Sequence, residues 1–177
     1  ALPNPTPAPV PTGPVTEPPP PSPTPIPVPA WAADGRLNLL LIGSGAGPGF
    51  NGTSVVQTHM TNSRLTDPEV LEFRFPVRLD SYEIREGSGG AGHWRGGDGG
   101  VRRVRFLEHM TASILSNGRS VPAFGSNGGS PGALGINRIE RSDGRIEVLD
   151  HIGSAAMEPG DVFVIETPGG GGWGKPA

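Results

Sequence analysis

The segment from Thr58 to Glu72 has a high density of side chains that can transfer protons or bind anions. Within fifteen residues it supplies an imidazole, an amide, a guanidinium and a carboxylate, at His59, Asn62, Arg64 and Asp67. A histidine held near a carboxylate can be fixed in one tautomer and act as an acid or a base near neutral pH. A structural role fits the same residues equally well, with Asp67 capping a helix and Arg64 pairing with a following glutamate.

A second segment, from Gly87 to Gly99, embeds Arg95 and Asp98 among glycines. A guanidinium can bind a carboxylate or a phosphate through two parallel hydrogen bonds. Neighbours without a Cβ allow such an anion to approach the backbone closely. The alternative is that Arg95 and Asp98 pair with each other within a set of tight turns.

Other classes of site are not indicated by the sequence. The four histidines lack the spacing of metal ligands, and with no cysteine there is neither a disulfide nor a Cys-based zinc site. Two G-x-G-x-x-G runs begin at Gly47 and Gly87, but neither leads into a helix, as a dinucleotide fingerprint requires. A net charge of −3 gives no reason to expect binding to nucleic acid or to a membrane surface. We therefore expect no metal and no cofactor-binding residue in this chain.

The elements that must position these segments are expected to be mainly short β-strands between glycine clusters. Alternating or compact β-prone runs predict strands at residues 37–42, 54–58, 77–85, 101–106, 111–116, 136–141, 145–149 and 161–166. In one of them, Val101, Val104 and Phe106 are expected to be buried and the arginines solvated. The pair Arg102-Arg103 interrupts that alternation.

One short helix and one tight hairpin are also predicted. Asp67 as N-cap and Pro68 at the first helical position should begin a helix that continues through Phe73. Asp143-Gly144 between two strand-like runs predicts a type I′ turn, which needs two positive φ angles. The fold class is therefore a mainly β, glycine-rich domain with long loops and one short helix.

The first thirty residues differ from the rest of the chain, because nearly every second one is proline. Proline fixes φ and lacks an amide hydrogen, so residues 1–30 are expected to form a disordered, polyproline II-like tail. This tail fits a spacer or a ligand for SH3-like and WW-like grooves. Residues 31–177 are sufficient for one domain. The lack of cysteine is compatible with a reducing compartment, and we expect a soluble, cytoplasmic protein without membrane contact.

Five motifs occur in the order found in the hydantoinase B/oxoprolinase family, and residues 43–174 resemble its C-terminal part. These motifs are Gly43–Gly52, His59–Glu72, Gly87–Gly99, Pro122–Gly135 and Pro159–Gly174. The sequence Asp67-Pro68-Glu69 is most similar to the 5-oxoprolinase branch. The sequence departs from the family pattern at three sites, namely Gln57, Ser63 and the dipeptide Gly118-Arg119.

The resemblance implies part of an ATP-dependent cyclic-amide hydrolase of glutathione metabolism that converts 5-oxo-L-proline to L-glutamate. An amide resists water because of resonance, and phosphorylation of its oxygen creates a leaving group and lowers the barrier. The family places ATP and Mg²⁺ in a hydantoinase A-like subunit or domain and its metal-binding motifs upstream. This chain alone is therefore expected to be inactive.

Hydrolysis of a phosphorylated lactam needs activated water, oxyanion donors and groups that hold the substrate's charges. We assign these roles to six residues that should converge on one cleft: His59 as acid or base, Asn62 as donor, Arg64 and Arg95 as anion holders, Asp67 and Asp98 as orienting carboxylates. A hypothesis from a different class is a non-catalytic β module on a proline-rich stalk that binds a protein partner. The sequence leaves open whether the chain forms a homo-oligomer.

Overall fold

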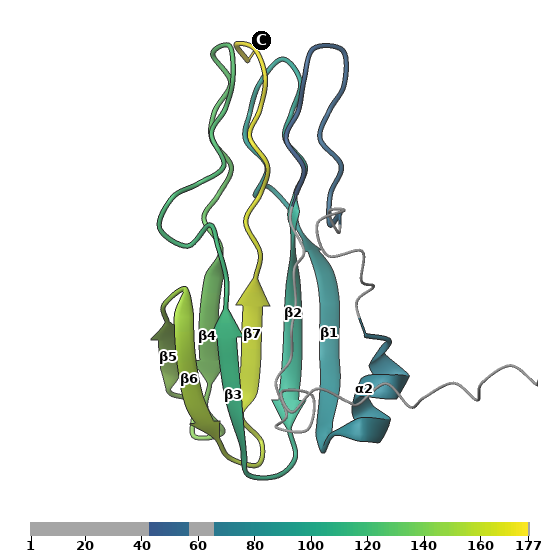
Figure 1. Ribbon diagram of the computed structural model, residues 1–177, viewed down its shortest axis with the longest axis vertical. Helices are drawn as coiled ribbons and strands as arrows, with labels where there is room; N and C mark the ends of the chain where they lie inside the picture. Colours follow the sequence, from purple (N-terminus) through teal and green to yellow (C-terminus); the bar gives the residue numbers. More distant parts are fainter. Residues whose placement is uncertain (1–42, 57–65, 177) are drawn as a thin grey trace, which may run out of the picture.

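The computed structural model describes residues 43–56 and 66–176, which form seven strands and one short helix (Figure 1). The elements are α2 (Pro68–Arg74), β1 (Val77–Arg85), β2 (Gly99–Phe106), β3 (Met110–Leu115), β4 (Ile136–Glu140), β5 (Ile146–Leu149), β6 (Ile152–Met157) and β7 (Val162–Glu166). The prediction of a mainly β domain with long loops and one short helix is confirmed. The proline-rich tail and the strand predicted at residues 37–42 lie outside the described residues.

The strands form a two-layer sandwich. Five of them make an antiparallel sheet in the order β1-β2-β7-β4-β5, and β3 pairs with β6 in a second sheet that packs on one face of it (Figure 1). The core between the sheets includes Phe106, Ile139, Met157 and Phe163, each less than a tenth exposed. Burying one such side chain stabilises the fold by about 1.5–3 kcal/mol. This core therefore holds in place the strands from which the glycine-rich loops extend.

The short helix α2 is confirmed with its predicted cap. The carboxylate of Asp67 accepts a hydrogen bond from the backbone N–H of Glu69 at 2.9 Å, and Pro68 occupies the first helical turn. Leu71 is buried against the core. Glu72 accepts a hydrogen bond from the backbone N–H of Leu79 at 2.8 Å and thereby joins the helix to β1.

The inward face of β2 differs from the prediction. Arg102 is buried together with Val104 and Phe106, whereas Val101 shares the outer face with Arg103. The strict alternation of a pleated strand decides this arrangement, because residues 102, 104 and 106 must share one face. The expectation that all three arginines are solvated was wrong for Arg102.

The outer face of the large sheet is covered by ion pairs. Arg103 binds both carboxylate oxygens of Glu140, at 2.9 and 2.6 Å, while Arg138 contacts Glu140 and Glu166. The hydrogen bond from Arg103 lowers the pKa of Glu140 below its ordinary value. Val164, directly between Arg103 and Arg138 in the strand register, is fully buried beneath these side chains.

The hairpin between β4 and β5 is confirmed, but its turn is not type I′. Gly144 has a positive φ of 89°, whereas Asp143 does not, and the N–H of Gly144 donates to the carbonyl of Arg141 at 2.9 Å. The Arg141 N–H in turn donates to the carbonyl of Arg145. This pattern fits a three-residue loop that ends in one left-handed glycine. The side chain of Asp143 accepts from the N–H of Arg145 and holds this geometry.

Two strand predictions require correction. β6 was missed because Gly153, Ser154, Ala155 and Ala156 have little intrinsic strand preference, and it forms by pairing along the whole of β3. Conversely, Ser54 and Val55 of the strand predicted at 54–58 form a turn. No helix in the described part of the chain is long and apolar enough to cross a membrane.

Candidate functional site in the glycine-rich loops

The glycine-rich motifs gather beyond one end of the sandwich as a bundle of extended segments (Figure 1). The segment after β7 lies at its centre and donates hydrogen bonds from Gly169, Gly170 and Gly172 to the carbonyls of Ala133, Gly97 and Ser130, respectively. It also accepts hydrogen bonds from Gly90, Ala46 and Ser126. Five neighbouring stretches of the chain therefore contact one central segment, which a flat sheet would not allow.

Backbone packing explains why the central segment is made of glycine. A Cβ at Gly169, Gly170, Gly171 or Gly172 would overlap the carbonyl oxygen of Ser88, Ser44, Phe124 or Ala91, respectively. Ser88 and Ala91 belong to the same stretch, whereas Ser44 and Phe124 belong to two others. The run from Gly87 likewise enters this bundle rather than the first turn of a helix, so the dinucleotide interpretation has no structural support in the described residues.

Arg95 and Asp98 form an ion pair at the base of the bundle. One nitrogen of Arg95 lies 2.9 and 3.3 Å from the two carboxylate oxygens of Asp98, which also accepts from the backbone N–H of Gly89 at 2.7 Å. The backbone N–H of Arg95 donates to the side chain of Asn51 at 2.8 Å. Asp98 is mostly covered, whereas the Arg95 side chain is 51% exposed. The pair thus fixes the loop and still presents a cation to solvent.

Of the other four predicted site residues, only Asp67 lies within the described part of the chain. Asp67 caps α2 beside the sandwich, whereas Arg95 and Asp98 belong to the loops beyond the end of the sheet (Figure 1). His59, Asn62 and Arg64 lie outside the described residues. Convergence of all six residues on one cleft therefore stays a prediction.

A cavity of about 260 Å³ lies where β3 meets the start of the glycine-rich bundle. Its lining includes Arg119, Thr167 and Gly43. Burial, together with the nearby charge of Arg85, lowers the pKa of Arg119 to about 10. The guanidinium donates to the side-chain oxygen of Asn137 at 2.7 Å and to a loop carbonyl, so Arg119 ties the loop after β3 to β4. The sequence contained no signal for this role beyond one basic residue in a polar loop.

Arg102 is the least expected polar residue in the described part of the chain. It is 1% exposed, and none of its three guanidinium nitrogens has a hydrogen-bond partner among residues 43–56 and 66–176. Burial lowers its pKa, an effect that the neighbouring Tyr82 partly offsets. A buried cation without an anionic partner is costly, so we expect Arg102 to lower the stability of this chain. In the sequence, the only sign of this buried arginine was that Arg102-Arg103 interrupts the alternation of apolar and polar residues in β2.

Replacing Arg102 with methionine should raise the free energy of unfolding of this chain by about 2 kcal/mol. Methionine keeps an unbranched, flexible shape and removes the unpaired charge. Urea denaturation of the purified chain measures the change. Arg103→Met on the opposite face is the matched control and should be neutral or destabilising, because Arg103 is paired. A loss of stability in Arg102→Met would instead show that the guanidinium has an anionic partner.

The described residues contain no group of three or more potential metal-ligating side chains. His109 and His151 lie on the surface, where His109 contacts Glu158 and His151 contacts Asp150. Together, these observations describe a β-sandwich that carries a tightly packed bundle of glycine loops, in which the Arg95 side chain is half exposed.

Comparison with known proteins identifies this architecture. The chain belongs to the hydantoinase B/oxoprolinase family, whose model matches residues 33–176. An uncharacterized protein of Schizosaccharomyces pombe is 51% identical over 136 residues, covering 75% of this chain and 11% of that protein. The 5-oxoprolinase 1 of Arabidopsis thaliana is 48% identical over 133 residues, covering 75% of this chain and 10% of the enzyme.

Solved structures share the fold. The ATP-dependent caprolactamase of Pseudomonas jessenii superimposes with a TM-score of 0.63 at 24% identity, covering 76% of this chain and 24% of that one. The chain spans about a tenth of the length of the first curated relatives it matches. It therefore corresponds to one part of much longer proteins.

Proposed function

We propose that this chain is the C-terminal part of an ATP-dependent 5-oxoprolinase that opens 5-oxo-L-proline to L-glutamate. The observation that carries the proposal is the 48% identity to a 5-oxoprolinase across 133 residues. The longer enzyme would act in the cytoplasm, in glutathione metabolism. ATP and Mg²⁺ would bind in its hydantoinase A-like region, so the present chain would not turn over substrate alone.

The exposed cation at the base of the glycine bundle supports a role in holding an anion. Among the described residues, the hydrogen bonds of the Arg95 guanidinium use only its Nη2 atom, which leaves Nε and Nη1 able to bind a carboxylate or a phosphate. Asp98 orients Arg95 because its own carboxylate is fixed by the Gly89 N–H. In this proposal Arg95 and Arg64 hold the charges of the substrate or of its phosphorylated form.

We assign the hydrolysis step at the substrate carbonyl to residues of the segment between Val56 and Thr66. His59 would activate water, and Asn62 would donate a hydrogen bond to the developing oxyanion. Asp67 has its position set by the helix cap, so the segment is anchored at one end. At the other end, the N–H of Val55 donates to the carbonyl of Asp98, which joins the segment to the Arg95 loop.

A domain exchange tests this proposal in a complete enzyme. Substituting residues 33–176 of this chain for the matching segment of Arabidopsis 5-oxoprolinase 1 should preserve ATP hydrolysis that depends on 5-oxo-L-proline. Within the chimera, His59→Ala should lower kcat by roughly 100-fold or more, since general acid–base catalysis commonly contributes that much. Coupled release of phosphate and glutamate measures both quantities.

His109→Ala is the matched control, because His109 is exposed and its one side-chain hydrogen bond within the described residues is to Glu158. It should leave turnover unchanged. A chimera that folds and binds nucleotide but shows no activity stimulated by 5-oxo-L-proline would contradict the proposed substrate. Wild-type turnover in His59→Ala would remove that residue from the catalytic assignment.

A further inference from the structure

The stretch from Asn51 to Val55 holds the backbone of Arg95 from two sides. The N–H of Arg95 donates to the side-chain oxygen of Asn51 at 2.8 Å, and the carbonyl of Arg95 accepts from the N–H of Gly52 at 2.8 Å. A Cβ at Gly52 would overlap the backbone nitrogen of Gly97, which belongs to the same loop as Arg95. The stretch therefore lies directly against the loop that carries Arg95.

The same stretch holds the backbone of Asp98. The N–H of Asp98 donates to the hydroxyl of Ser54 at 3.0 Å, and its carbonyl accepts from the N–H of Val55 at 2.9 Å. Both members of the Arg95–Asp98 ion pair are thus bound through N–H and carbonyl by one short segment. Because the backbone fixes where a side chain begins, these hydrogen bonds restrict where the Arg95 guanidinium can lie.

Val55 adopts an unfavourable backbone conformation in this segment. Its φ is 53°, in the left-handed region that a β-branched residue rarely enters. Such strain persists only where the surrounding structure holds it, and it is concentrated at functional sites. The turn at Ser54 and Val55 allows two consecutive residues to bind the N–H and the carbonyl of Asp98. These hydrogen bonds help to offset the cost of the turn.

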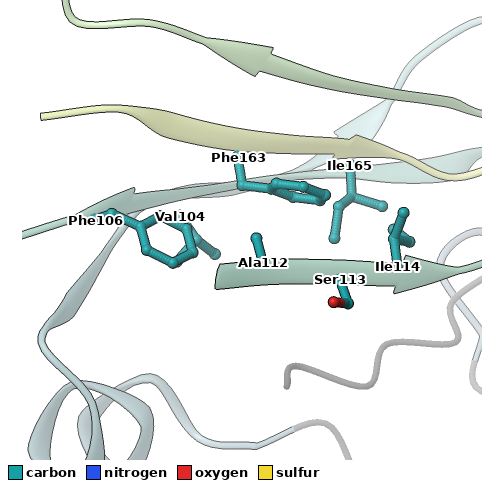
Figure 2. Close-up of a pocket in the computed structure, with 7 residues that line it drawn as sticks. All are labelled: Val104, Phe106, Ala112, Ser113, Ile114, Phe163 and Ile165. Carbon is teal, nitrogen blue, oxygen red and sulfur yellow. The ribbon is translucent and has the colours of Figure 1, made fainter. Parts of the chain in front are cut away.

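The core side chains leave little space of their own for a ligand. Phe106, Phe163 and Ile165 of the large sheet face Ala112 of β3 across a cavity of only about 20 Å³ (Figure 2). The further role is therefore sought in the loops beyond the sandwich, where Arg95 is half exposed.

We propose that Asn51 and Ser54 are positioning residues, which orient Arg95 and Asp98 for anion binding. This role rests on the proposed function, in which Arg95 holds a charge of the substrate. Neither Asn51 nor Ser54 needs to contact the substrate, since each acts through a backbone N–H of the ion pair. The run Gly47–Gly52 thereby has a role different from that of a dinucleotide fingerprint, because it presents Asn51 to the Arg95 loop.

Kinetics of the chimera described above measure the positioning role. Asn51→Ala should raise KM for 5-oxo-L-proline at least ~5-fold and change kcat less than about 2-fold, because a misplaced cation weakens ground-state and transition-state binding alike. Ser54→Ala, which removes the hydroxyl that holds the Asp98 N–H, should act in the same direction and replaces Asn51→Ala if that variant does not fold.

Asp143→Ala is the matched control. The side chain of Asp143 also accepts a hydrogen bond from a backbone N–H, at 3.0 Å, and it is exposed. It lies in the hairpin between β4 and β5, at the opposite end of the sandwich from the glycine-rich loops (Figure 1). Asp143→Ala should therefore leave KM unchanged.

A double-mutant cycle shows whether Asn51 acts through Arg95. Asn51→Ala should have no further effect on KM in a chimera that already carries Arg95→Ala, since the cation that Asn51 positions is then absent. The contact itself can be tested in the full 177-residue chain without any enzymatic activity. The backbone amide of Arg95 should exchange at least ~10-fold faster with solvent in Asn51→Ala, but not in Asp143→Ala.

Three results would overturn the positioning role. An unchanged KM in Asn51→Ala, with a raised KM in Arg95→Ala, would show that Arg95 keeps its place without Asn51. An equal effect of Asn51→Ala in both backgrounds would show that Asn51 acts on stability and not through Arg95. Unchanged exchange of the Arg95 amide would show that Asn51 does not hold it. By contrast, an unchanged KM in Arg95→Ala would contradict the assignment of Arg95 in the proposed function, and the positioning role would fail with it.

Discussion

Replacing Gly171 with alanine should destabilise the folded chain by about 3 kcal/mol and lower its thermal midpoint by roughly 10 °C. The added Cβ would overlap the carbonyl oxygen of Phe124 and lie 3.1 Å from the backbone nitrogen of Gly125. Neither atom can move freely, because the loop that contains Phe124 is held to the central segment by a hydrogen bond from the N–H of Ser126 to the carbonyl of Gly172. Thermal denaturation followed by circular dichroism measures the change.

Gly45→Ala is the control for this prediction. It lies in the same bundle, but a Cβ there would meet only the carbonyl oxygen of Gly171 at 3.9 Å, an ordinary contact. Alanine also restricts the unfolded chain more than glycine does, so this variant should be neutral or slightly stabilised. Equal losses in Gly171→Ala and Gly45→Ala would contradict the close packing of the central segment.

Replacing Asp161 with asparagine should destabilise the chain by about 3 kcal/mol at neutral pH. This carboxylate is 1% exposed and receives hydrogen bonds from Arg141 and from the backbone N–H groups of Ser142 and Glu158. An asparagine NH₂ group would face one or more of these donors in either orientation. The charge of Arg141 would also lose its most buried partner. Urea denaturation measures the loss.

Asp143→Asn is the control for this prediction, because Asp143 is exposed and belongs to the adjacent hairpin. It should have little effect. A loss as large as that of Asp161→Asn would show that charge in the hairpin, rather than the buried network, determines the stability.

The same network predicts a pH dependence. Burial raises the pKa of Asp161, but hydrogen bonds from Glu158, Arg141 and Ser142 outweigh it and hold the pKa below its ordinary value. A carboxylate with a lowered folded-state pKa contributes stability that is complete above its unfolded pKa, about 3.9, and is lost as pH falls through the folded value. The difference between the unsubstituted chain and Asp161→Asn should therefore narrow below about pH 4.

Local sequence signals determined much of the β1 and α2 region. The alternation in residues 77–85 predicted β1 with its observed bounds, and Asp67-Pro68 predicted the start of α2. Both signals act within a few residues, since a cap bonds the next turn and a pleat repeats every second position. The Arg95–Asp98 pair was likewise one of two interpretations of that segment, because only two residues separate its members.

Other features were decided by contacts between distant parts of the chain. β6 has small residues of weak strand preference and forms because β3 supplies its hydrogen-bond partners. Arg102 is buried because its strand places it on the same face as Phe106, whatever its charge. The glycine runs are compatible with many backbone conformations. The conformation they adopt is fixed by hydrogen bonds and close contacts with the backbone of five neighbouring stretches. Composition and short-range pattern thus determined the fold class, whereas packing across the chain decided which face, turn and loop geometry the protein adopts.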